Sequence, residues 1–319
     1  MPKLNFSLIG AGGYIAPRHM KAIRDTSNEL VAAMDKHDSV GIIDSYFPKA
    51  MFFQEIKELG MYMDSLRQND QVVDYVTVAS PNFLHLEHIQ FGLNAGANVI
   101  CEKPIVLNPS DLDYLEILEN ESNNRIYSVL QLRHHPAILS LKEKVSRNKD
   151  TKADIELTYI TSRGKWYLKS WKGDILKSGG VATNVGVHFF DMLHFIFGEV
   201  QENVIFLNDP TKASGYIEYE GARVRWFLSL DIEDIPMSER ALGKRTYRSL
   251  TSDGETLEFS DGFIDLHTDV YREILSGRGY GLKENRTAIK TVADIRNAPL
   301  SKSGNLTHPM AISIKKDSV

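Results

Sequence analysis

The first 125 residues alternate between short apolar runs and longer stretches with helical spacing, and this alternation restricts the fold more than any other feature. The apolar runs predict strands at Asn5–Ile9, Leu30–Met34, Tyr75–Ala79, Asn98–Cys101 and Tyr127–Leu130. Helical spacing separates these runs at Ala16–Ser27, Tyr46–Leu59, Leu84–Ala95 and Pro109–Glu121. Short apolar strands joined by helices are typical of a parallel sheet covered on both faces, so we expect an α/β domain built from βαβ units.

The pattern changes after about residue 150, where strands follow one another through turns. Predicted strands lie at Ile155–Ser162, Tyr216–Tyr219, Arg223–Leu230, Arg245–Thr251 and Glu255–Phe259. Predicted helices accompany them at Val187–Ile196, Asp265–Leu275 and Glu284–Asn297. We therefore expect a C-terminal α+β domain on an open, mostly antiparallel sheet, with domains at 1–125 and 126–319. A chain of 319 residues is also longer than one hydrophobic core usually serves.

Charge and cysteine usage exclude several classes of function. The formal net charge of −5 offers no general attraction to nucleic acid or to anionic membranes, so we expect neither as a partner. The single cysteine, Cys101, excludes an intrachain disulfide and a cysteine-rich metal site. The His, Asp and Glu residues show no metal-ligand spacing, so we expect no metal. No leader or long apolar run is visible, which favours a cytoplasmic location.

The segment LIGAGGYIAPRH, residues 8–19, predicts a strand, a glycine turn and the start of a helix. Gly10 and Gly12 match the first two glycines of a GxGxxG dinucleotide fingerprint, but Ile15 stands at the third. A branched side chain there would obstruct close packing of the helix on the strand. Gly10, Gly13 and Ala16 give an alternative spacing with a small residue at that position, so the turn still predicts a dinucleotide site.

An acidic residue follows the second predicted strand and bears on the choice of cofactor. Asp35 lies 25 residues after Gly10. A carboxylate at this strand end accepts hydrogen bonds from ribose hydroxyls and disfavours a 2′-phosphate, so we expect NAD rather than NADP. The residues expected to bind NAD in this part of the chain are Gly10, Gly12, Gly13, Tyr14, Ile15 and Asp35.

Two longer segments resemble the signatures of a known family. They are VDYVTVASPNFLHLEHIQFGLNAGANVICEKP, Val73–Pro104, and SGGVATNVGVHFFDMLHFIFG, Ser178–Gly198. Both are similar to the Gfo/Idh/MocA oxidoreductases. The resemblance implies an N-terminal Rossmann domain and a C-terminal domain whose open sheet carries substrate and oligomer contacts. It therefore implies a homodimer or homotetramer.

The resemblance also assigns site residues. Lys103 in the Glu-Lys-Pro segment corresponds to the family's catalytic lysine, and His188 is the second catalytic candidate. The family usually has an acidic residue four positions before this histidine, where this chain has Asn184. Residues four apart share a helix face, so Asn184 is expected to bind the substrate beside His188. Expected neighbours of the cofactor in the family segments are Ser80, Asn82, His85, Glu102 and Lys103.

The segment KWYLKSWKGD, Lys165–Asp174, resembles a nucleotide-sugar branch of this family. Its enzymes oxidise the 3-hydroxyl of UDP-N-acetylglucosaminuronic acid to the 3-keto sugar for bacterial surface polysaccharide such as the lipopolysaccharide O-antigen, with NADH regenerated by 2-oxoglutarate. An acidic protein needs local cations for so anionic a substrate. The candidate substrate-binding residues are Asn184, Arg163, Lys165, Tyr167, Trp171 and Lys172. His267, Tyr271 and Arg272, on one face of a predicted helix, are further candidates for substrate contact.

Three other functions fit the same residues. One is oxidation of a different sugar or of inositol within the family. The second is NAD-dependent glycoside hydrolysis, in which the cofactor is not consumed. The third is nucleotide sensing without catalysis, against which the presence of Lys103 and His188 argues.

Overall fold

The computed structural model describes residues 3–147, 151–252, 255–257 and 265–316. The chain forms two compact units, Met1–His134 with Asp265–Arg286, and His135–Ile264 with Thr287–Val319. The expected division at 125/126 differs from this, because it treats each domain as one continuous stretch. The helix α10 (Leu266–Leu275) belongs to the first unit, where it packs against α1 (Ala16–Asp25) and its Tyr271 stacks on Phe6 at 5.9 Å.

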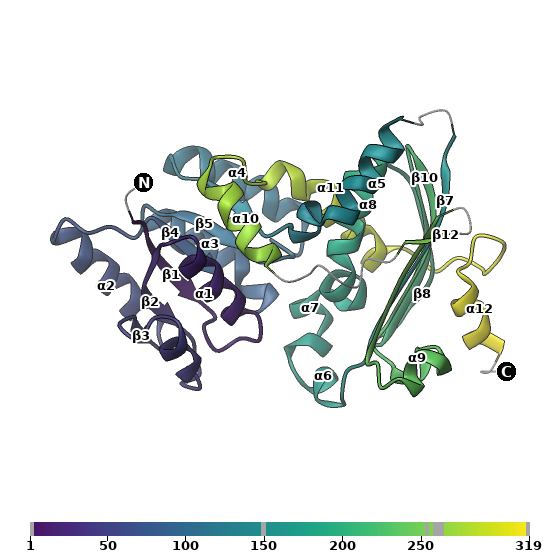
Figure 1. Cartoon of the computed structure of the whole chain (residues 1–319), viewed down its shortest axis with the longest axis horizontal. Helices are drawn as coiled ribbons and strands as arrows, with labels where there is room; N and C mark the ends of the chain where they lie inside the picture. The colour runs from purple at the N-terminus through teal and green to yellow at the C-terminus, as the bar shows by residue number, and fades with distance from the viewer. Residues whose placement is uncertain (1–2, 148–150, 253–254, 258–264, 317–319) are drawn as a thin grey trace. The chain divides into compact units, whose positions relative to one another are not determined.

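The first unit contains a six-stranded sheet in which all neighbouring strands are parallel (Figure 1). Its order is β3-β2-β1-β4-β5-β6, the order of a Rossmann fold. The strands are β1 (Asn5–Ile9), β2 (Glu29–Met34), β3 (Met51–Phe53), β4 (Tyr75–Val78), β5 (Asn98–Cys101) and β6 (Ile126–Ser128). The order reverses between β1 and β4, and such a fold binds ligands beyond the carboxyl ends of the strands at this point.

Helices connect these strands and bury their apolar sides on the sheet. Besides α1, they are α2 (Ile56–Gln68), α3 (His85–Asn94) and α4 (Pro109–Ser122), with short 3₁₀ turns η1 (Gly41–Ser45), η2 (Asn82–Leu84) and η3 (Gln131–His134). Right-handed crossovers place α1 on one face and α2, α3 and α4 on the other, where Arg67 of α2 donates to the Ala95 carbonyl that follows α3. The predicted helix Tyr46–Leu59 is wrong, because its middle forms β3, a three-residue edge strand paired with Ala32–Met34.

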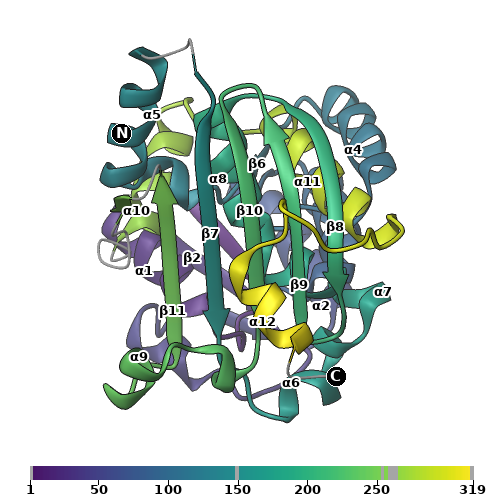
Figure 2. The same ribbon diagram turned by 90° about the vertical axis from the view of Figure 1, so that its right-hand side faces the viewer.

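The second unit contains a mixed sheet in the order β12-β11-β7-β10-β9-β8 (Figure 2). Among its described strands only β7 and β10 pair in parallel, which confirms the mostly antiparallel prediction. The strands are β7 (Ala153–Thr161), β8 (Val200–Asn208), β9 (Lys212–Tyr219), β10 (Ala222–Ser229), β11 (Thr246–Ser252) and β12 (Glu255–Leu257). β8 is not among the strands predicted from the sequence, and residues 258–259 of the predicted strand Glu255–Phe259 lie outside the described residues.

Successive residues of β10 place their side chains on opposite faces of this sheet. Trp226 packs edge-on against Phe190 of α8 (Val187–Phe197), whereas Phe227 points to the opposite face and joins a cluster with Ala311 of α12 (Pro309–Lys316). Figure 2 shows α12 lying over this face. The remaining helical segments are α5 (Pro136–Arg147), α6 (Trp166–Lys169), η4 (Trp171–Gly173), α7 (Ile175–Ser178), η5 (Ala182–Gly186), η6 (Ile232–Asp234), α9 (Met237–Ala241) and α11 (Leu282–Asn297).

Within the described ranges, no helix combines the length and the apolar character that crossing a bilayer requires.

Candidate active site

The glycine turn joins β1 to α1, and Gly10, Gly13 and Ala16 occupy its closely packed positions. Gly10 has φ +91°, and a Cβ there would lie 2.6 Å from the Ala79 carbonyl group. The Gly13 amide donates to the Gly10 carbonyl at 3.0 Å, and Ala16 is fully buried against the core. Ile15 packs its side chain on that core, and Tyr14 is 92% exposed. Close backbone approach therefore requires glycine at position 10, and the branched Ile15 is accommodated.

Asp35 follows β2 and is held directly beside the glycine turn. One carboxylate oxygen accepts a hydrogen bond from the Gly12 amide at 2.9 Å, and the other accepts from the His37 amide at 2.9 Å. A carboxylate offers about four acceptor positions, so positions remain for ribose hydroxyls. This arrangement suits the adenosine half of NAD, whose ribose lacks the 2′-phosphate of NADP.

Two histidines hydrogen-bond to the loop that follows β4. The Ser80 hydroxyl lies 2.8 Å from His88 Nδ1. His85 is buried, with its two ring nitrogens 2.8 Å from the Ser80 carbonyl and 2.7 Å from the Pro104 carbonyl. Burial lowers the pKa of His85 and lowers that of His88 to about 4. His85 therefore ties the loops after β4 and β5 together with its ring. Asn82 is buried in the same loop, at the start of η2.

Glu102 and Lys103 follow β5 at the same edge of the sheet. The Lys103 ammonium donates to Glu102 Oε2 at 3.1 Å, and the Lys103 amide donates to the same oxygen at 3.2 Å. Burial opposes ionisation of Glu102, but Lys103 and two histidine hydrogen bonds outweigh it, so the pKa of Glu102 lies well below its ordinary value. Glu102 is therefore a buried carboxylate paired with the predicted catalytic lysine.

The two histidines that bind Glu102 come from helices distant in sequence. His19 Nε2, from α1, lies 3.1 Å from Glu102 Oε1, and His267 Nε2, from α10, lies 2.9 Å from the same oxygen. Tyr271 places its hydroxyl 2.9 Å from His19 Nδ1. His19 has no role predicted from the sequence, and His267 and Tyr271 were predicted to contact the substrate. All three are buried around Glu102, and no local sequence signal indicates that they meet.

The second unit brings Asn184 and Tyr167 together. Asn184 lies in η5, a π-helical turn directly before α8, and its amide donates to the Tyr167 hydroxyl. Burial raises the pKa of Tyr167 although the Asn184 hydrogen bond and the Arg163 charge oppose this. His188 begins the next turn and is half-buried, with its ring edge-on to Tyr159 at 6.0 Å. π-Helical turns are common at functional sites, and this one contains Asn184, whose side-chain amide is predicted to bind the substrate.

Cations and aromatic rings gather around α6 and η4. The Lys172 ammonium lies 4.3 Å from the centre of the Trp171 ring and 5.9 Å from that of Trp166. Burial lowers the pKa of Lys172, and the neighbouring Arg163 charge lowers it further. Among the residues that the structure describes, Arg163, Lys165 and Lys172 form no ion pair with a carboxylate. Of the predicted substrate-binding residues in this segment, Lys165 is exposed and Trp171 is half-exposed.

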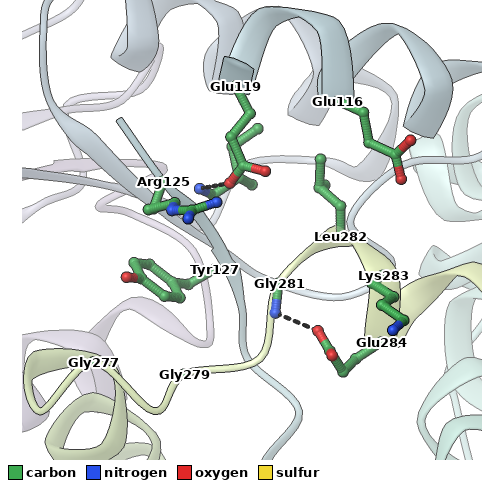
Figure 3. A pocket seen from close by; sticks show the side chains of 11 residues that line it. Glu116, Glu119, Arg125, Tyr127, Gly277, Gly279, Gly281, Leu282, Lys283 and Glu284 are labelled. Atoms are coloured by element: carbon green, nitrogen blue, oxygen red, sulfur yellow. Dashed lines mark hydrogen bonds between the residues drawn. The ribbon is translucent and has the colours of Figure 1, made fainter. Parts of the chain in front are cut away.

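The first unit also contains a pocket of about 330 Å³ (Figure 3). It is lined by α4, β6 and the glycine-containing segment before α11. Its Glu119 and Glu284 carboxylates accept hydrogen bonds from the Ile126 and Gly281 amides at 2.7 and 2.8 Å, so these acids hold backbone in place. None of the predicted site residues lines this pocket.

The first unit thus contains a close backbone turn, the Asp35 carboxylate beside it and the Lys103 and Glu102 pair. The second unit contains His188, the Asn184 amide and a set of cations beside aromatic rings.

Comparison with known proteins identifies the family. Residues 4–130 match the profile of the Gfo/Idh/MocA oxidoreductase family with an NAD-binding Rossmann fold, and residues 151–237 match the profile of its C-terminal alpha/beta domain. The chain is 50% identical to the WlbA (WbpB) dehydrogenase from Thermus thermophilus, solved in complex with NAD and alpha-ketoglutarate, with a TM-score of 0.93 over 96% of this chain and 99% of that one. The same dehydrogenase, solved with NAD and UDP-GlcNAcA, gives 49% identity and a TM-score of 0.92, with the same coverage of both chains.

More distant curated relatives match over part of their length. An oxidoreductase of Formosa agariphila is 25% identical over 205 residues, which is 62% of each protein. The inositol 2-dehydrogenase of Rhizobium meliloti is 26% identical over 207 residues, covering 61% of this chain and 56% of that protein. The chain thus spans less than two thirds of the length of these curated relatives. The two matching domains and the 50% identity over nearly the whole chain show that this protein belongs to the Gfo/Idh/MocA family of NAD-binding oxidoreductases.

Proposed function

We propose that this protein is an NAD-dependent dehydrogenase that oxidises the 3-hydroxyl of UDP-N-acetylglucosaminuronic acid to the 3-keto sugar for bacterial surface polysaccharide. The observation that carries the proposal is the group of cations in the second unit. In a chain of net charge −5, Arg163, Lys165 and Lys172 are clustered without carboxylate partners among the described residues. A diphosphate and a uronate supply the missing negative charges.

The aromatic residues around these cations favour a nucleotide sugar over a small anion. Lys172 lies against Trp171 and Trp166, and Trp166 is 57% exposed. Flat apolar rings match the faces of a sugar or a uracil, while the ammonium matches a phosphate oxygen. The relative at 50% identity was solved with NAD and UDP-GlcNAcA in one complex and with NAD and alpha-ketoglutarate in another, which supports the same ligands for this chain.

The residues at the β1–α1 turn fit NAD. The absence of side chains at Gly10, Gly12 and Gly13 leaves the backbone open to a pyrophosphate, and a Cβ on Gly12 would lie 3.2 Å from Asp35. Asp35 retains acceptor positions for ribose hydroxyls. Bound there, NAD would supply the hydride acceptor for oxidation of the sugar, and 2-oxoglutarate would serve as the final oxidant. Further proposed cofactor contacts come from the strand-end loops, with Ser80, Asn82 and Glu102, while His85 holds these loops in place.

The proposed proton transfer uses Lys103 and His188. One of the two takes the hydroxyl proton of the sugar, and the other stabilises the oxygen as negative charge develops on it. Lys103 donates to the ionised Glu102, which suits an ammonium that stabilises an oxyanion, so we assign the base to His188. Asn184 cannot accept a proton and is assigned to substrate binding together with Tyr167.

A direct assay tests this function. Purified protein is incubated with UDP-N-acetylglucosaminuronic acid, with and without 2-oxoglutarate, and the product is analysed by mass spectrometry. We expect a 3-keto product two hydrogens lighter than the substrate, and multiple turnovers only with 2-oxoglutarate. Parallel incubations with inositol, glucose 6-phosphate and a simple aryl glycoside cover the alternative functions. Faster oxidation of one of these polyols, or release of a free sugar from the glycoside, would refute the proposal.

Variants test the assigned residues in the same assay. Lys103→Ala is expected to lose most of kcat, and His188→Asn to lose kcat while still binding NAD. Lys57→Ala, which removes an exposed lysine of α2 in the same unit, is the matched control. Full activity of Lys103→Ala would contradict the assignment of Lys103.

Assembly and location remain predictions. We expect a homodimer or homotetramer, which light scattering on the purified protein would measure. The cytoplasmic location is likewise a prediction from the sequence.

A further inference from the structure

The buried hydrogen-bond network around Glu102 is larger than the pairing of Glu102 with Lys103 requires. It joins four elements of the first unit, namely β4, the end of β5, helix α1 and helix α10. We propose that His19, His267 and Tyr271 are positioning residues that hold Glu102 as a fixed anionic support for Lys103. This inference rests on the proposed catalytic role of Lys103.

The direction of each hydrogen bond follows from the donors and acceptors present. An ionised carboxylate only accepts, so both His19 and His267 must present an N–H at Nε2 to Glu102 Oε1. With Nε2 as the donor to Glu102, His19 Nδ1 is placed to accept a hydrogen bond from the Tyr271 hydroxyl, 2.9 Å away. The Tyr271 oxygen in turn accepts from Thr77, whose hydroxyl lies 2.9 Å away. The hydrogen bonds donated by Thr77, Tyr271 and His19 therefore all run in the direction of Glu102.

The two carboxylate oxygens of Glu102 accept hydrogen bonds from different donors. Among the described residues, Oε1 accepts from both histidines, whereas Oε2 accepts from the amide and the ammonium of Lys103. Burial lowers the pKa of His267 to about 4, although Glu102 opposes the shift, so this ring is neutral at pH 7. A neutral His267 orients the carboxylate without neutralising it, which leaves its charge to Lys103. Because the His19 and His267 rings meet edge-on at 5.3 Å, rotation of either ring is restricted.

The same three side chains could in principle bind a metal ion. One ligand atom from each of His19, Glu102 and His267 lies within 4.8 Å of the other two. A divalent ion there would displace both histidine protons from the carboxylate and would place a double positive charge beside the Lys103 ammonium. The hydrogen bonds already satisfy every one of these atoms. The geometry therefore favours a hydrogen-bonded support, and metal analysis of the purified protein is part of the test.

The first arm of the test needs no substrate. In full-length protein labelled with [15N]histidine, we expect the His267 signals of a neutral ring protonated at Nε2 between pH 6 and 8. In [15N]lysine-labelled protein, a hydrogen-bonded ammonium signal should be absent from Lys103→Met and broadened in His267→Leu. Protonation of His267 at Nδ1, an unchanged Lys103 signal in His267→Leu, or one equivalent of bound zinc would overturn the proposal.

The second arm measures the proposed reaction. His267→Leu is expected to lower kcat roughly 10- to 100-fold by misplacing Lys103, with KM for NAD unchanged. His267→Gln keeps an N–H donor of similar reach and should recover most of this loss, which a general packing defect would not allow. Tyr271→Phe should lower kcat less, since it removes only the hydrogen bond behind His19. Equal kcat values for His267→Leu and the wild-type protein would overturn the proposal.

The buried His308 of the second unit provides a matched control. It too is buried and hydrogen-bonded, 3.1 Å from the Thr158 hydroxyl, and its pKa is also lowered by burial to about 4. His308→Leu should lower the unfolding temperature as His267→Leu does, but without the fall in kcat, and an equal fall would overturn the proposal. Wild-type protein that fails to oxidise the UDP-sugar would refute the proposed function alone, because the NMR arm decides the positioning of Lys103 independently.

Discussion

Replacement of Gly10 by alanine tests the claim that close backbone approach shapes the cofactor turn. The new Cβ would lie 2.6 Å from the carbonyl carbon and oxygen of Ala79 and 2.7 Å from the Ser80 amide nitrogen. These are backbone atoms of the loop after β4, so no side chain can rotate away. The substitution must therefore push β1 and β4 apart where the sheet order reverses.

Two effects contribute to the expected loss of stability. The left-handed backbone at φ +91° costs an alanine about 1–2 kcal/mol, and forcing an extra carbon into a packed site costs about 1–3 kcal/mol. We therefore expect Gly10→Ala to lower the free energy of unfolding by about 3 kcal/mol. Because the Gly10 carbonyl also holds the Gly13 amide, NAD affinity should fall at least about tenfold, equivalent to about 1.4 kcal/mol.

Two glycines of the same unit separate the contributions. Gly277 has φ +80° with no atom near its missing Cβ, so Gly277→Ala reports the backbone effect alone. Gly41 has neither feature, and Gly41→Ala should be nearly neutral. Urea unfolding measures stability, and calorimetric titration measures NAD binding. If Gly10→Ala proved as stable as Gly277→Ala and bound NAD normally, the argument from close approach would be refuted.

The remaining predictions concern cofactor choice, substrate charge and acid stability. Asp35→Ser removes the charge that repels a 2′-phosphate, so the ratio of NADP to NAD affinity should rise, as calorimetric titration would show; an unchanged ratio would contradict the role of Asp35. Lys172→Met retains contact with the tryptophans but removes a phosphate partner, so KM for the UDP-sugar should rise about tenfold with kcat nearly constant, a loss that high salt should shrink. The pKa values of His88, His267 and His308 are lowered to about 4 in the folded protein, so the unfolded chain binds more protons below about pH 6.5. The contribution of these histidines to the free energy of unfolding should be fully present above pH 6.5 and should fall toward pH 4, by up to about 3 kcal/mol for each histidine. Urea unfolding at several pH values measures this; a free energy of unfolding that did not fall would disprove their burial in neutral form.

The features that the sequence could predict are encoded by neighbouring residues. The β1, α1, β5 and α4 segments begin where periodicity and turn residues indicated, and the Gly10, Gly13, Ala16 spacing agrees with the buried Ala16. Edge strands show a weaker hydrophobic pattern than the central strands of a sheet. β3 has three residues inside a predicted helix, and β8 mixes polar and apolar residues because it lies at the edge of its sheet.

By itself, the sequence determined the fold class, the family, the choice of NAD and the segments that carry Lys103, Asn184 and His188. Their chemistry follows from residue type and local spacing, which a linear sequence records directly. Only the tertiary structure decided that α10 returns to the first unit and that His19 and His267 meet on one oxygen of Glu102. These residues are 83 and 165 positions from Glu102, and no local rule relates them. Their contact depends on helix packing across the sheet, which brings distant parts of the chain together to bury apolar surface and satisfy a buried charge.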